Sequence, residues 1–89
     1  MNMKSKVYKL NKGFIFQEIE HEMVIFDGEN SVLFSFNETA SFIFKRLKKG
    51  QEPEKIARNL AKTYEVSEAT ALKDVNNLIG KLAKKDIIK

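Results

Sequence analysis

The 89-residue sequence contains no cysteine, no tryptophan, one histidine and one proline. Without cysteine the chain can form no disulfide, no thiolate zinc site and no protein-ligated iron–sulfur cluster. His21 lies between two glutamates in a predicted turn, and a solitary histidine makes a poor metal site. We therefore expect neither a metal nor an organic cofactor.

Long apolar runs are also missing, since no stretch approaches the roughly 18 consecutive apolar residues of a membrane span. Residues 1–13 contain dispersed charges and no apolar segment of the kind found in signal peptides. We therefore expect a cytoplasmic protein. The sequence has no paired-carboxylate pocket, glycine-rich phosphate loop or Ser/His/Asp grouping, so we expect no enzymatic activity.

The length of the chain suits a single domain. Charge is distributed unevenly along it. Residues 1–12 carry four lysines and are expected to form a basic arm ahead of a single domain over residues 13–89. Residues 13–44 contain no Lys or Arg and have a net charge of −6, whereas residues 45–62 have a net charge of +5. Because an acidic segment repels phosphates, any nucleic-acid contact would have to come from the second half.

The first half of the sequence predicts three strands joined by tight turns. Residues 14–20, 22–27 and 31–36 are rich in β-branched and aromatic side chains, and DGEN at 27–30 is a strong turn signal. Alternation along the third strand would place Val32, Phe34 and Phe36 on one face. Three consecutive short strands predict an antiparallel meander.

The second half predicts three helices, so the expected fold class is α+β with a winged helix-turn-helix-like order of elements. Asn37 is a natural N-cap for residues 38–48, Pro53 fits the first turn of 53–64, and Ser67 caps 68–84. Only residues 65–67 connect the second and third helices, which is the spacing of a helix-turn-helix.

The two outer strands of this meander differ in charge. The first carries Glu18 and Glu20, which typically protect an edge, whereas residues 31–36 contain neither charge nor proline. An uncharged apolar edge promotes aggregation unless another segment shields it, either from the protein's own chain or as a strand of a partner. Strand addition is one mode of peptide recognition, and the same strand is a candidate for homodimer contacts.

The helix-turn-helix spacing keeps a DNA-binding transcriptional regulator as the alternative function. Recognition helices read bases mainly with their N-terminal residues. Here residues 68–72 and Asp74 are acidic, small or apolar, and Lys73 is the first positively charged residue of the helix. We therefore expect negligible specific DNA binding.

One margin of the third helix is a candidate binding surface. The helical period places Asp74, Leu78, Lys81 and Lys85 in a stripe beside a core seam. Leu78 is expected on this margin, so an aspartate there should leave the fold intact. The seam itself, where aspartate should unfold the domain, consists of Leu72, Val75, Ile79 and Leu82.

Three segments together resemble the PqqD-like family: FSFNETASFIFKRL at 34–47, PEKIARNLAKTYEVS at 53–67 and DVNNLIGKLAKKDII at 74–88. The resemblance covers about residues 12–88. Two positions depart from the family pattern. Phe36 stands where leucine is usual, and Asp86 replaces the usual glycine near the end.

The resemblance implies a recognition domain for ribosomally synthesised, post-translationally modified peptides. Such domains have three strands followed by three helices, and bind the leader of a precursor peptide as a strand added to the third strand, in a groove closed by the third helix. Standalone members act beside a separate modifying enzyme, such as a radical-SAM protein or a leader peptidase. Carried over to this sequence, the peptide-binding residues are Val32, Leu33, Phe34, Ser35, Phe36, Asp74, Leu78 and Lys81.

Overall fold

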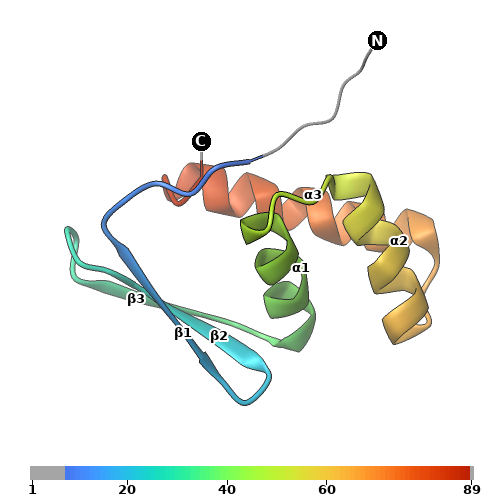
Figure 1. Cartoon of the computed structure of the whole chain (residues 1–89), viewed down its shortest axis with the longest axis horizontal. Helices are drawn as coiled ribbons and strands as arrows, with labels where there is room; N and C mark the ends of the chain where they lie inside the picture. The colour runs from blue at the N-terminus through green and yellow to red at the C-terminus, as the bar shows by residue number, and fades with distance from the viewer. Residues whose placement is uncertain (1–7, 89) are drawn as a thin grey trace, which may run out of the picture.

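The computed structural model describes residues 8–88 and contains three antiparallel strands followed by three helices (Figure 1). The α+β fold class and the order of elements are confirmed, and all three helices have the predicted bounds. The first strand ends one residue earlier than predicted, and the third begins one residue later. The strands are β1 (Phe14–Ile19), β2 (Glu22–Asp27) and β3 (Val32–Phe36), and the helices are α1 (Glu38–Lys48), α2 (Pro53–Tyr64) and α3 (Glu68–Lys84).

The meander has β2 at its centre, with β1 and β3 as its edges. Asp27 organises the β2–β3 turn, because its carboxylate accepts hydrogen bonds from the backbone N–H groups of Glu29 and Asn30 and from the Asn30 side-chain amide. The bond from the Asn30 side chain is the main reason that the pKa of Asp27 is lowered. This turn fixes the register in which Val32 lies opposite Asp27.

One face of the sheet packs against the helices. Met23 and Ile25 of β2 are buried in the core, and the rings of Phe16 and Phe36 both contact Phe44 of α1, with centroid separations of 5.2 Å and 5.7 Å. Phe16 and Phe36 of the edge strands therefore serve the core. The helical and C-terminal part of this core includes Ile43, Phe44, Leu47, Ile56, Leu60, Val75, Ile79, Leu82 and Ile87.

The other face of the sheet is open and carries an apolar row. Ile15 pairs with Phe26, and Phe26 pairs with Leu33, so the three side chains follow one another across the strands. Their exposed fractions are 64%, 37% and 65%. This row ends at Leu33, on the β3 edge.

The C-terminal segment returns to the start of the domain. Asp86, where the resemblance led us to expect glycine, adopts the left-handed conformation that glycine favours, with φ of 59°. The turn is thereby retained, and Ile87 and Ile88 are buried. Ile88 forms a β-bridge with Leu10, so residues 8–12, which we assigned to a basic arm, contact the domain. The rest of that arm lies outside the described residues.

The helices found in residues 8–88 are too short or too polar to cross a membrane. Over the same residues, no three His, Asp or Glu side chains are grouped as metal ligands would be.

Candidate functional site

The direction of the backbone groups along β3 follows from two hydrogen bonds, one donated from within β2 and one from the residue directly after it. Residues of an antiparallel strand alternate, pointing their N–H and C=O groups first to one neighbour and then to the other. The N–H of Gly28 donates to the Gly13 carbonyl at 3.2 Å, on the β1 side. The N–H of Met23 instead points to the β3 side, where Ser41 accepts it at 2.7 Å. Odd-numbered residues of β2 therefore face β3.

The outward-facing residues of β3 can now be assigned. Phe34 and Phe36 lie opposite Ile25 and Met23, so their backbone groups face β2. Leu33 and Ser35 lie opposite even-numbered residues, so their N–H and C=O groups point away from the sheet. No strand among residues 8–88 pairs with this side of β3. The sequence singled out this edge correctly, whereas the outward positions follow only from the register.

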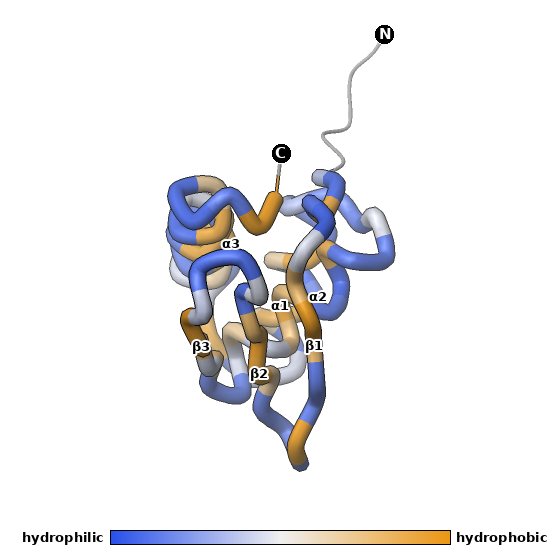
Figure 2. Tube along the Cα trace, turned by 90° about the vertical axis from the view of Figure 1, so that its left-hand side faces the viewer, coloured by the Kyte–Doolittle hydropathy of each residue, from blue (hydrophilic) through white to orange (hydrophobic). Residues whose placement is uncertain are grey.

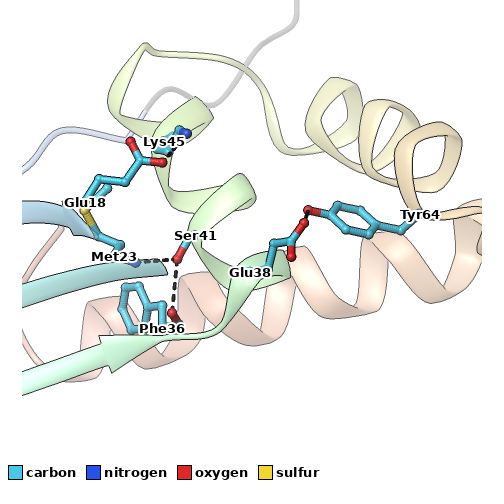
Figure 3. Close-up of polar contacts among 7 residues, drawn as sticks. All are labelled: Glu18, Met23, Phe36, Glu38, Ser41, Lys45 and Tyr64. Carbon is cyan, nitrogen blue, oxygen red and sulfur yellow. Dashed lines mark hydrogen bonds and ion pairs between the residues drawn. The ribbon is translucent and has the colours of Figure 1, made fainter. Parts of the chain in front are cut away.

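Ser41 fastens the end of β3 to α1 (Figure 3). Its hydroxyl accepts the Met23 N–H and donates to the Phe36 carbonyl at 3.1 Å, replacing a direct bond between the two strands. The side chain is 1% exposed. Sequence reasoning did not identify this residue, although a serine among the buried positions of the predicted helix is a recognisable signal.

Replacing Ser41 with alanine should destabilise the domain by about 1–3 kcal/mol, because the buried Met23 N–H loses its partner. Urea unfolding followed by circular dichroism measures this difference. The matched control is Ser35→Ala, an exposed serine, whose effect should stay within about 0.5 kcal/mol. Equal stability of the two variants would show that the hydroxyl relay contributes nothing.

A groove of about 440 Å³ lies between β3 and α3. No Cα atom of α3 lies within 8 Å of a Cα atom of β3, so the backbones of the two elements stay apart along the groove. In Figure 2, α3 passes over the β3 side of the sheet, and β1 lies on the opposite side. The groove is lined by Leu33, Phe34, Ser35, Phe36, Asn37, Ala40, Leu78, Lys81 and Lys85.

The structure brings together six of the eight residues that the sequence indicated. Val32 and Asp74 are exposed but do not line the groove. Three lining residues were missing from the predicted set. Asn37 had been interpreted only as an N-cap, and Ala40 had not been assigned to the site. Lys85 belonged to the predicted stripe on the third helix without being assigned to the site. The residues that meet are Leu33, Phe34, Ser35, Phe36, Leu78 and Lys81.

The expectation that Leu78 lies outside the core is wrong. Leu78 is 6% exposed and belongs to the core cluster, whereas Leu72, which we assigned to the seam, is only half-buried. Helical periodicity gives the direction of a side chain but not how far a neighbouring element extends over it. Near Leu78 the end of β3 and the start of α1 close over the helix, since Phe36 and Ala40 share the groove with it.

The charged side chains of the groove are both lysines. Lys81 belongs to α3, and Lys85 is the residue directly after this helix. The Lys85 ammonium lies 4.3 Å from the centroid of the Phe34 ring. No carboxylate lines the groove. Within residues 8–88 the sole ion pair joins Lys45 to Glu18 at 2.8 Å, far from these lysines in sequence. The groove therefore presents two lysines that form no ion pair among residues 8–88.

Other polar pairs connect structural elements and form no second site. The hydrogen bond from Lys45 is the main reason that the pKa of Glu18 is lowered (Figure 3). Burial raises the pKa of Tyr64, and its hydrogen bond to Glu38, at 3.0 Å, raises it further. These contacts join β1 to α1 and α1 to α2.

The fold, with a groove beside the β3 edge that no strand of residues 8–88 covers, defines a small winged-helix-like domain. The chain belongs to the family of coenzyme PQQ synthesis protein D (PqqD), whose model matches residues 22–88. The family resemblance seen in the sequence is thus confirmed.

Solved structures with the same fold include two complexes with leader peptides. One is TbiB1 in complex with the TbiA(beta) leader peptide, with 23% sequence identity and a TM-score of 0.83, covering 91% of this chain and 94% of that chain. Another is a lasso peptide synthetase B1 complexed with the leader peptide, with 26% identity and a TM-score of 0.87, covering 94% and 99%. A comparison with curated proteins found no match.

Proposed function

We propose that this domain binds the leader of a ribosomally synthesised precursor peptide as a fourth strand on the outer edge of β3. The observation that carries the proposal is the outward direction of the Leu33 and Ser35 backbone groups beside an open groove. The family and the two leader-peptide complexes among the similar structures support it.

Strand addition accounts for both affinity and selectivity. A strand lying about 4.8 Å from β3 can exchange hydrogen bonds with the N–H and C=O groups of Leu33 and Ser35. Alternate side chains of the added strand then point into the groove toward Leu78 and Lys81. The remaining side chains lie beside Leu33 and continue the apolar row of the open sheet face.

The domain supplies binding, and the chemistry on the precursor belongs in this proposal to a separate modifying enzyme, such as a radical-SAM protein or a leader peptidase. The groove itself offers lysines, apolar side chains and hydroxyl or amide groups, with no nucleophile–base pair. The DNA-binding alternative gains no support from the structure, since Glu68 and Ala69 are exposed at the start of α3.

The test is fluorescence anisotropy with the labelled leader of a precursor encoded beside this gene. We expect a dissociation constant on the order of micromolar or below. Size-exclusion chromatography with and without leader measures whether the domain forms a dimer through β3. Such a dimer would occupy the edge that the leader needs, so leader binding should convert it to monomer. Absence of binding to every precursor encoded nearby would overturn the proposal.

A further inference from the structure

The groove between β3 and α3 has two chemically different ends. At one end, Phe36, Ala40 and Leu78 provide apolar surface. At the other end, Lys85 lies over the Phe34 ring, and Lys81 lies on the helix between Leu78 and Lys85. Phe34 precedes Phe36 along β3, so the strand runs from the basic end of the groove toward its apolar end.

Neither lysine forms an ion pair within the described domain. Both side chains are exposed, and over residues 8–88 neither ammonium lies within 4 Å of a carboxylate. The Lys85 ammonium contacts the face of the Phe34 ring, and the carboxylates of Asp27, Glu29 and Asp86, which line a neighbouring pocket with Lys85, form no ion pair with it. A ligand that adds beside β3 therefore meets two cations at one end of the groove and none at the other.

We infer that the leader strand carries an acidic side chain that reaches Lys81 and Lys85, and a large apolar side chain two residues away that covers Ala40 and Leu78. This inference rests on the proposed strand addition. Side chains on the same face of a strand are about 6.8 Å apart. Along α3, Leu78 is separated from Lys81 by a rise of about 4.5 Å and from Lys85 by about 10.5 Å. A spacing of two strand residues falls between these values.

The order of the two side chains follows from strand direction. Every pairing in this sheet is antiparallel, and antiparallel pairs are the commoner kind overall. A leader antiparallel to β3 runs from the apolar end of the groove to its basic end. The leader motif is therefore apolar–any residue–acidic, read from its N-terminus.

The experiment uses charge reversal on both partners. The double variant Lys81→Glu/Lys85→Glu should bind the labelled leader of the neighbouring precursor about tenfold more weakly, because two attractions become repulsions. The matched control, Lys73→Glu/Lys84→Glu, makes the same change in net charge on exposed residues of α3 that do not line the groove. This control should bind the leader within about twofold of the unchanged domain.

Peptide variants then identify the acidic side chain. Each Asp or Glu of the leader is changed singly to Lys, and the one that lies two residues after a large apolar residue should recover binding to Lys81→Glu/Lys85→Glu while losing it to the unchanged domain. Equal weakening by both double variants, or recovery by no peptide, would overturn this inference while leaving strand addition standing. Failure of the unchanged leader to bind the unchanged domain would overturn both.

Discussion

Proline at Leu33 or Ser35 should weaken leader binding at least about tenfold, and proline at both positions should abolish it. Each of these N–H groups points away from β2, so its loss removes no bond within the sheet. Proline is tolerated on edge strands for this reason. The ligand, however, loses a donor and meets the proline ring, which should cost well over the 1.4 kcal/mol that corresponds to a tenfold change. Anisotropy titration beside circular dichroism measures binding and folding on the same samples.

Two sets of controls separate strand addition from other modes of docking. Leu33→Ala and Ser35→Ala keep the outward backbone donors, so binding should change only a few-fold. Phe34→Pro removes an N–H that faces β2 and should destabilise the sheet itself. If both edge prolines remain folded and bind the leader normally, the leader docks on the helices and the proposed mode is wrong.

The helices could be predicted from the sequence because their ends depend on local interactions. The Asn37 side chain accepts the Ala40 N–H at 2.9 Å, and the Ser67 side chain accepts the Thr70 N–H at 3.1 Å. Pro53 begins α2 without a side-chain cap. Each of these determinants acts within three residues, so that a single sequence contains the whole signal.

The site could be predicted only in part, because its remaining features depend on contacts between distant segments. The absence of charge in 31–36 indicated the strand that has the groove beside its unpaired edge. Ser41 acquires its role from Met23, which is 18 residues away. Lys85 lines the groove and contacts the Phe34 ring, and the local sequence does not show which distant residue either Ser41 or Lys85 contacts.

The burial of Leu78 shows the same limit. Periodicity placed it at the boundary of the apolar face, and only the approach of β3 and α1 made it part of the core. The alternation of side chains predicted which residues of β3 face the helices. It could not predict which backbone groups face outward, since that depends on the register with β2.

Leu78→Asp should unfold the domain or leave it close to its unfolding midpoint at room temperature. The side chain is 6% exposed, so truncation alone should cost about 2–5 kcal/mol. The new carboxylate would also lie in an apolar environment, which adds several kcal/mol unless it takes up a proton. Because domains of this size have only about 5–15 kcal/mol of stability, the sum is comparable to the whole. Thermal unfolding followed by circular dichroism measures the effect.

Leu72→Asp is the matched control, since it makes the same chemical change on the same helix at a half-buried position. Sequence periodicity predicts that the Leu72 variant unfolds and the Leu78 variant does not, and the structure predicts the reverse order of stability. Lys81→Glu, one turn beyond Leu78 and exposed, should leave the unfolding temperature nearly unchanged. A Leu78→Asp domain that melts like the unchanged protein would show that Leu78 belongs to the groove alone. Substitutions at Leu78 would then alter the groove surface of α3 without unfolding the domain.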